Sequence, residues 1–181
     1  MQATQFLVST LFDLYLMVCI LRVWLQLVRA DFYNPVSQFV VKVTNPVVIP
    51  LRRIIPGLGG IDWAGVVLVY LVAFAKLSAL QVLFGNGFPA AAIAIASIFA
   101  AVKELFLIVF WVTVIRAILS WVSQGYNPIE ALLVQLTDPL LRPIRKVIPP
   151  VGGLDLSLLV FLIALQFAQI LFNDLVRGLS F

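Results

Sequence analysis

The sequence predicts an all-α membrane protein with four transmembrane helices, built as two parallel repeats of helix, interfacial amphipathic linker and helix. Three observations support this fold class. Hydrophobic residues make up 63% of the 181 residues and charged residues only 11%, which is too little polar surface to cover a soluble core. Four apolar segments are each long enough to cross a hydrocarbon core of about 30 Å. A basic, proline-rich passage occurs twice between them.

The four apolar segments are expected to be transmembrane helices. Backbone amides in the hydrocarbon core must find their hydrogen-bond partners within their own segment, which favours a helix. The first segment lacks the basic start and the small-residue cleavage site of a signal peptide, so we expect it to be retained. The predicted spans cover about residues 6–28, 63–84, 97–122 and 156–177.

The third segment has two interpretations. Its apolar text begins at Ala90 and continues past Lys103 and Glu104 to Val122, which is too long for one untilted crossing. Either residues 90–96 form a short interfacial lead-in after the GNGFP turn, or the whole helix is long and tilted. We favour the lead-in. The chain then divides into a first repeat, 1–84, with linker 29–62; an outer connection, 85–96; and a second repeat, 97–181, with linker 123–155.

The internal repeat is carried by one motif, NPx9[ND]Px3Px[RK][RK]xIPxxGGxD, which occurs once in each linker. Two spans per repeat bring both repeats into the membrane in the same direction, so they are parallel and not inverted. Thr44 and Thr137 also correspond. The paired motif positions are Asn34 and Asn127, Pro35 and Pro128, Pro46 and Pro139, Pro50 and Pro143, Arg52 and Arg145, Arg53 and Lys146, and Asp62 and Asp155.

Each linker is predicted to be ordered. Its Asn-Pro pair can cap a helix and supply its first residue. The apolar residues that follow recur at i, i+3, i+4 and i+7, which is typical of an amphipathic helix lying along the interface. The later prolines are expected to prevent one continuous helix, and the basic pairs beyond them to meet lipid phosphates. The apolar positions are Val36, Phe39, Val40 and Val43 in one linker and Ile129, Leu132, Leu133 and Leu136 in the other.

The distribution of positive charge predicts the orientation. Basic residues cluster in the two linkers, whereas the opposite side has only Lys103 and Arg177 near span ends. Because positive charge marks the cytoplasmic side, we expect cytoplasmic linkers and both termini on the opposite, outer side of the membrane. The linker residues are Arg29, Lys42, Arg52, Arg53, Arg142, Arg145 and Lys146.

The composition excludes several kinds of site. The chain has no histidine and one cysteine, Cys19. An intramolecular disulfide, a Cys/His metal site and a His-dependent nucleophile are therefore unavailable, as is bis-histidine haem ligation. We expect no catalytic residue, no metal site and no cofactor. Nucleic-acid binding is not expected either, because the basic residues flank apolar spans and do not form a solvated patch.

Charged residues within spans are the candidate functional groups. Asp13 and Lys76 lie at similar depth and could form an ion pair, either as a structural contact or as a proton or ion relay. Arg22 and Arg116 lie near the inner ends of their spans at repeat-related positions. Each could snorkel to the interface, or both could share a contact with the adjacent linker, for instance with its Asn-Pro turn.

Other acidic residues have simpler interpretations. Asp62 and Asp155 precede spans and are expected to cap those helices; a catalytic dyad is the weaker alternative, because no acid–base partner is visible. Lys103, Glu104 and Asp174 are expected to snorkel near the outer ends of spans. The glycine pairs after the basic residues are expected to free the backbone to turn back toward the membrane.

The duplicated motif between four hydrophobic spans resembles the YggT family (YlmG-type) of small bacterial membrane proteins, in its two-repeat proteobacterial form. The resemblance covers nearly the whole chain; one departure is Pro150, where the first copy has glycine. It implies an inner-membrane protein without known catalytic residues. Proteobacterial relatives are linked to osmotic-stress tolerance and ion homeostasis, single-copy relatives to cell division, and chloroplast relatives to cytochrome maturation and nucleoid organisation.

The resemblance therefore leads to a non-enzymatic inner-membrane protein that supports osmotic-stress tolerance or ion homeostasis. A membrane assembly or scaffold factor, for cell division or for envelope or cytochrome biogenesis, is the alternative. A small channel or transporter subunit is the second alternative. The expected partners are the bilayer, anionic headgroups at the basic linkers, and either another membrane protein or further copies of the chain.

Overall fold

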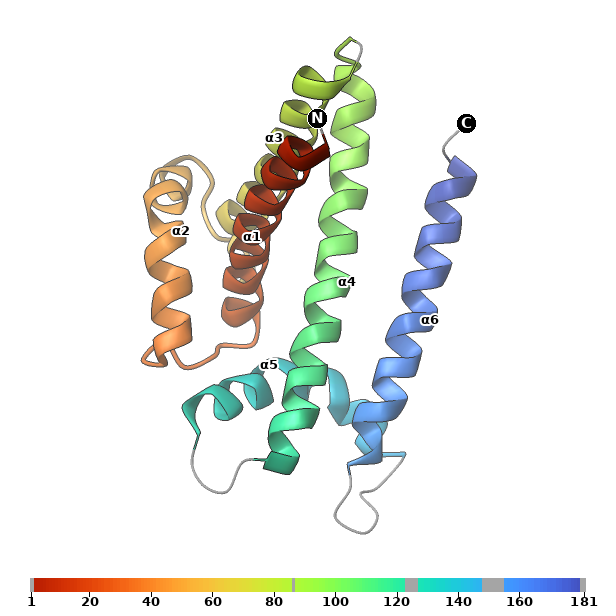
Figure 1. Cartoon of the computed structure of the whole chain (residues 1–181). Helices are drawn as coiled ribbons and strands as arrows, with labels where there is room; N and C mark the ends of the chain where they lie inside the picture. Colours follow the sequence, from red (N-terminus) through yellow and green to blue (C-terminus); the bar gives the residue numbers. More distant parts are fainter. Residues whose placement is uncertain (1, 86, 123–126, 148–154, 180–181) are drawn as a thin grey trace. The chain divides into compact units, whose positions relative to one another are not determined.

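The computed structural model describes residues 2–85, 87–122, 127–147 and 155–179 (Figure 1). Within these ranges the regular structure is helical, and four helices are long and apolar enough to cross a membrane. The predicted all-α fold with four spans is confirmed. The helices are α1 (Gln2–Leu27), α2 (Pro35–Ile54), α3 (Trp63–Phe84), α4 (Ala90–Val122), α5 (Pro128–Arg145) and α6 (Leu156–Leu179).

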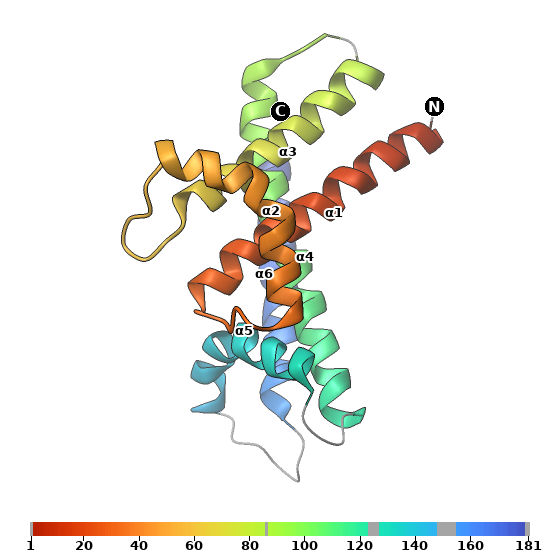
Figure 2. The same cartoon turned by 90° about the vertical axis from the view of Figure 1, so that its left-hand side faces the viewer.

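The chain forms two compact units, residues 1–105 and 106–181, which divide within α4. In the first unit α1 packs along α3, and α2 crosses α1 (Figure 2). The first part of α4 approaches α3, where the hydroxyl of Tyr70 donates to the carbonyl of Ala94 at 3.4 Å. In the second unit α5 lies across the end of α4 and the start of α6 (Figure 1).

The third span is one uninterrupted helix. The favoured interpretation of residues 90–96 as a separate interfacial lead-in is wrong, because α4 runs from Ala90 to Val122 without a break. The alanine-rich text after Pro89 explains the continuity, since alanine is the strongest helix former. Ser97 does not interrupt the helix either; its hydroxyl is buried and donates to the carbonyl of Ile93 at 2.6 Å.

The linker helices are also continuous, contrary to the prediction that their prolines would break them. Pro46 and Pro50 lie inside α2, and Pro139 and Pro143 lie inside α5. Each proline removes one backbone hydrogen bond and crowds the carbonyl four residues earlier, which bends a helix when the following turn remains packed. Figure 2 shows this curvature in α2.

The predicted start of each linker helix is confirmed. The side chain of Asn34 accepts a hydrogen bond of 3.0 Å from the amide of Val36, and that of Asn127 accepts one of 2.9 Å from the amide of Ile129. Each caps a helix that begins with proline.

The faces that the linker helices bury within the protein overlap only partly with the apolar faces predicted to lie along the interface. In α2 the buried positions are Ser37, Val40, Thr44 and Val48, and Phe39 is 58% exposed. The buried face of α2 therefore includes the hydroxyl side chains of Ser37 and Thr44, which the predicted apolar face did not. In α5 three of the four predicted residues are buried within the protein, namely Leu132, Leu133 and Leu136, while Ile129 is exposed.

The chain turns from α2 back toward α3 at Gly59 and Gly60, whose φ angles are +65° and +80°. These left-handed conformations disfavour residues with a Cβ, which explains the glycine pair. The amide of Ile61 donates to the carbonyl of Leu58 at 3.2 Å across this turn. The corresponding pair Gly152 and Gly153 lies outside the described residues.

Candidate functional site: a repeated arginine network and an intramembrane charge cluster

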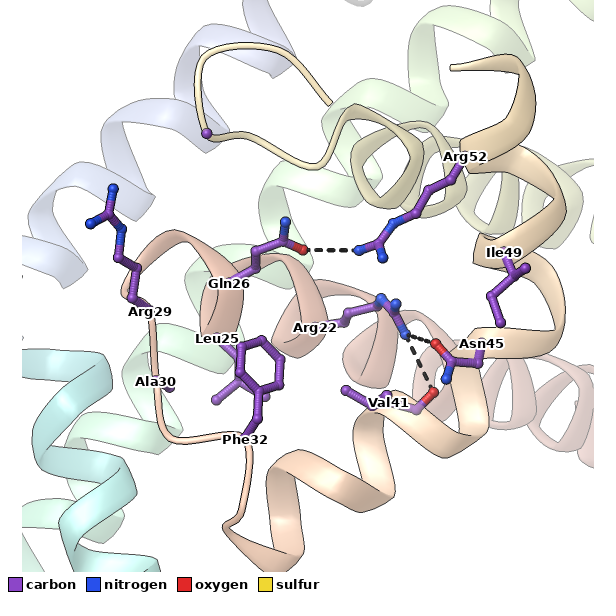
Figure 3. Close-up of a pocket in the computed structure, with 11 residues that line it drawn as sticks. Arg22, Leu25, Gln26, Arg29, Ala30, Phe32, Val41, Asn45, Ile49 and Arg52 are labelled. Atoms are coloured by element: carbon purple, nitrogen blue, oxygen red, sulfur yellow. Dashed lines mark hydrogen bonds between the residues drawn. The ribbon is translucent and has the colours of Figure 1, made fainter. Parts of the chain in front are cut away.

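Arg22 is a buried cation that reaches from α1 to the linker helix α2. Only 6% of the residue is exposed. Its Nη1 donates to Thr44 Oγ1 at 2.5 Å, to Asn45 Oδ1 at 2.9 Å and to the carbonyl of Val41 at 3.3 Å. Figure 3 shows the guanidinium group directed at Asn45 and Val41. The predicted contact between Arg22 and the linker is therefore present. Its partners are Thr44 and Asn45, in the middle of α2, and not the Asn34-Pro35 turn at the start of that helix.

Thr44 is oriented for this contact by its own helix. Its hydroxyl is fully buried and donates to the carbonyl of Val40 at 2.6 Å. Since the hydroxyl proton is used within the helix, the oxygen presents a lone pair to Arg22. Thr137 repeats the arrangement by donating to the carbonyl of Leu133 at 2.7 Å.

A second arginine ties the end of the linker helix to the start of the next span. Arg52 donates from Nε to Asp62 Oδ1 at 3.2 Å and from Nη2 to Asp62 Oδ2 at 2.6 Å, a bidentate pair. Arg52 Nη2 also donates to the Gln26 side chain at 3.3 Å (Figure 3). Arg22 Nε lies 4.0 Å from the same Asp62 carboxylate. One buried carboxylate thus serves two arginines.

The second unit contains the corresponding network. Arg116 donates from Nη1 to Thr137 Oγ1 and from Nη2 to Asp138 Oδ1, the latter at 3.1 Å. Arg145 donates to Asp138 at 3.0 Å and to Asp155 at 3.1 and 2.5 Å. Both arginines contact Asp138, and Arg145 also contacts Asp155.

The two aspartates that precede spans play related roles. The side chain of Asp155 accepts from the amide of Ser157 at 3.1 Å, which confirms it as a helix cap. Asp62 occupies the N-cap position of α3, and its carboxylate is turned mainly toward Arg52, with a weaker interaction with the amide of Gly65 in the first turn of the helix. Burial alone would raise the pKa of each carboxyl group, but hydrogen bonds and neighbouring positive charge hold both pKa values below the ordinary value of an aspartate.

A cavity of about 640 Å³ lies beside the network of the first unit (Figure 3). Three arginines line it: Arg22, Arg29 and Arg52. Gln26 and Asn45 add neutral polar groups, and no acidic residue belongs to the lining. The cavity is therefore positively charged, with polar side chains available as hydrogen-bond partners.

Arg29 has an unusual backbone conformation. Its φ is +54°, the one positive value at a described residue other than glycine. The amide of Arg29 donates to the carbonyl of Gln26 at 3.1 Å, and the amide of Ala30 donates to the carbonyl of Leu25 at 2.9 Å. This is a Schellman closure of α1, in which glycine usually occupies the left-handed position. A long cationic side chain stands there instead, at the wall of the cavity.

Charged side chains from three spans influence one another electrostatically in the first unit. Lys76 of α3 forms an ion pair with Asp13 of α1 at 2.5 Å, so the predicted pair is present. Glu104 of α4 interacts electrostatically with both residues. Glu104 had been expected near an outer helix end, but the early start of α4 places it well inside the helix. Charges in hydrocarbon are costly and usually functional.

The remaining predicted residues have different surroundings. Arg53 and Lys146 are exposed beside the paired arginines, so only one residue of each basic pair enters the network. The acceptors Thr44, Asn45, Thr137 and Asp138 were not predicted as partners. Their occurrence at equivalent positions of both motifs was the sequence feature that could have identified them as partners of the arginines. Within the described ranges, no group of three or more His, Cys, Asp or Glu side chains is placed to hold a metal ion.

The fold and these networks define a multi-pass membrane protein with two matched repeats. The CCB3/YggT family model matches residues 1–83 and 95–176. The chain belongs to this family.

Similar proteins span almost the same length. The chain is 51% identical to an uncharacterized protein in the proC 3' region of Vibrio alginolyticus, over 100% of this chain and 99% of the relative. It is 47% identical to the uncharacterized protein YggT of Escherichia coli K12, over 94% and 92% of the two chains. An uncharacterized protein of Haemophilus influenzae is 36% identical over 97% and 94%. No solved structure matches the chain.

Proposed function

We propose that this protein is a non-enzymatic inner-membrane protein that supports ion homeostasis and osmotic-stress tolerance, with Asp13, Lys76 and Glu104 as its ion-responsive centre. The observation that carries the proposal is the meeting of these three charges from three spans. The ammonium group of Lys76 is paired with Asp13, so Glu104, which feels the charge of both residues, is left without a counter-charge inside the cluster. A proton or a monovalent cation has the charge to compensate it.

The chemistry of the cluster supports ion handling better than a purely structural pair. A structural ion pair needs one acid and one base, which Asp13 and Lys76 already provide. Glu104 adds a second acid that a simple helix-to-helix tie does not require. Binding of a cation near Glu104 would weaken the attraction between Lys76 and the two carboxylates, and this would couple ion occupancy to the packing of α1, α3 and α4.

Flux measurement tests the proposal. Purified protein is reconstituted into liposomes, and proton, sodium and potassium fluxes are followed during an osmotic shift. We expect protein-dependent flux that falls at least tenfold in Asp13→Asn and in Glu104→Gln. Asp174→Asn is the matched control, because it removes an exposed carboxylate of α6. Absence of flux in the unmodified protein, or equal flux in all variants, would contradict ion handling.

Growth at high osmolarity tests the cellular part of the proposal. A strain lacking its own family member is complemented with each variant. The proposal expects the unmodified protein and Asp174→Asn to restore growth, and the two cluster variants to fail at equal membrane abundance. Alkaline phosphatase fused after residue 181 tests the proposed orientation, since the enzyme is active only if that end is periplasmic.

A scaffold function is the second candidate, and it is favoured by the fixed linkers. Each linker helix is tied to a preceding span through Thr44 or Thr137 and to the following span through Asp62 or Asp155. Such ties would hold an interfacial surface ready for a partner. A protein that is silent in the flux assay but crosslinks to one membrane protein through its linkers would favour this candidate over ion handling.

A further inference from the structure

We infer that the arginine-lined cavity of the first repeat binds a phosphate group, presented either by an anionic phospholipid or by free phosphate. This inference rests on the cavity beside α1 and α2 and is independent of the intramembrane charge cluster. A phosphate oxygen is the acceptor that guanidinium groups recognise best, because planar forks of N–H donors match its geometry.

The charge of the cavity is the first argument. Arg22, Arg29 and Arg52 line it without an acidic neighbour in the lining. Asp62 compensates part of this charge through its bonds to Arg52, and Arg22 and Arg52 still repel each other. Asp31, next to the lining residue Ala30, uses one carboxylate oxygen to accept from the amide of Tyr33. A bound anion would relieve the repulsion between the guanidinium groups.

Unused hydrogen-bonding capacity is the second argument. Arg22 is 94% buried, and its Nε has no hydrogen-bond partner among the described residues. The nearest carboxylate lies at 4.0 Å, beyond hydrogen-bond distance. A buried charged donor without an acceptor is costly. Because Nε is itself screened from solvent, a bound anion would relieve this cost by drawing the Arg22 guanidinium group further into the cavity that it lines.

The second repeat supplies the third argument, because it lacks both features that make the first site basic. Asp138 stands where the first repeat has Asn45, and it neutralises Arg116 and Arg145 directly. No Lys or Arg occurs between Arg116 and Arg142, so Arg29 has no counterpart. In the second repeat the carboxylate of Asp138 compensates the arginines. In the first repeat the corresponding position is uncharged, so an anion from outside the chain can compensate them.

The backbone of Arg29 and the size of the cavity complete the case. A left-handed residue with a long side chain carries a conformational cost that glycine would avoid, so a role for the Arg29 side chain accounts for the choice. The volume of about 640 Å³ suits a small ligand. Phe32 and Ile49 add apolar wall, which fits the glycerol portion of a phospholipid.

Binding to the full-length protein in neutral detergent tests the inference. One arm titrates phosphatidylglycerol against phosphatidylcholine with the same acyl chains, and the other titrates inorganic phosphate. The shift in the unfolding temperature gives the apparent affinity in each arm. The variants are Arg29→Gln and Asn45→Asp, the second of which copies the second repeat. Arg53→Gln is the matched control, because Arg53 is exposed beside Arg52 and does not line the cavity.

We expect each of the two site variants to weaken binding about tenfold or more, as loss of a charge-assisted hydrogen bond predicts, and Arg53→Gln to change it less than twofold. This pattern with phosphatidylglycerol identifies a lipid headgroup, and the same pattern with inorganic phosphate alone identifies free phosphate. If the Asn45→Asp variant does not fold, the binding measured for Arg29→Gln alone tests the inference. Absence of binding in both arms, or an equal loss in Arg53→Gln and Arg29→Gln, would overturn the inference.

Discussion

The guanidinium group of Arg116 donates a hydrogen bond of 3.1 Å to the carboxylate of Asp138. The equivalent bond in the first repeat runs from Arg22 to the uncharged amide of Asn45 at 2.9 Å. The hydrogen bond from the arginine is therefore present in both repeats, but its acceptor is neutral in the first repeat and negatively charged in the second. Each repeat holds a buried cation against its linker helix, and the two repeats differ in how completely that cation is compensated.

Thr44 is predicted to stabilise the first repeat through its hydroxyl group. Thr44→Val keeps the branched shape but removes the oxygen that accepts from Arg22. We expect the free energy of unfolding to fall by about 1 to 3 kcal/mol, because a buried cation loses an acceptor. Equilibrium unfolding in mixed detergent micelles measures the change. Ser9→Ala is the control, since Ser9 bonds its own helix at an exposed site, and we expect less than about 0.5 kcal/mol.

The Arg52–Asp62 pair predicts a loss of stability in acid. The hydrogen bonds and positive charge of Arg52 lower the pKa of Asp62 from its ordinary value in the folded protein. A lowered folded-state pKa contributes stability that is fully present above the unfolded value of about 3.9 and is lost as the pH falls through the folded value. The unfolding temperature should therefore decline below about pH 4. Asp62→Asn should reduce this dependence and cost about 1 to 3 kcal/mol at neutral pH; an unchanged acid profile would argue against the pair.

Cysteine crosslinking tests the contact between Asp13 and Lys76. Cys19 is first replaced by alanine, since it is the single cysteine of the chain. In this background Asp13→Cys with Lys76→Cys should link rapidly with a short bifunctional maleimide, because the native side chains touch. Asp13→Cys with Leu71→Cys is the control, because Leu71 is exposed and lies about a turn and a half away on α3. Failure of the 13–76 pair to link would exclude the contact.

Gly60 is predicted to be required for the turn into α3. Gly60→Ala places a Cβ on a residue with φ of +80°, at a cost of about 1 to 2 kcal/mol. Thermal unfolding of the purified protein measures the loss. Gly178→Ala is the matched control, because its added Cβ meets no neighbour within 4 Å and alanine favours a helix. Equal stability of the two variants would contradict the role of the left-handed turn.

Much of the fold could be predicted because the bilayer imposes it. Length and apolarity identify α1, α3 and α6, since a span must satisfy its own backbone, and the Asn-Pro caps are local. The linker prolines could not be interpreted locally. Whether a proline ends or bends a helix depends on the packing of the next turn, and Thr44 and Val48 are buried on either side of Pro46.

The partners of the candidate site required the tertiary structure. The sequence places Arg22 near a span end, where the local pattern allows either snorkelling or a contact with the linker. Only the crossing of α2 over α1 brings Thr44 and Asn45 to it. The predicted position of Glu104 was wrong for a related reason. A third span that begins near residue 97 places Glu104 close to the end of the helix, whereas the observed helix begins at Ala90 and has Glu104 in its interior.

The arginine network of each repeat draws all of its described partners from that same repeat. A chain with a single repeat would therefore already contain the whole set of donors and acceptors. Neither copy needs a partner from the other for this network. The two halves differ at Asn45 and Asp138 and in the presence of Arg29, so the compensation of the buried arginine differs between them while the architecture is kept.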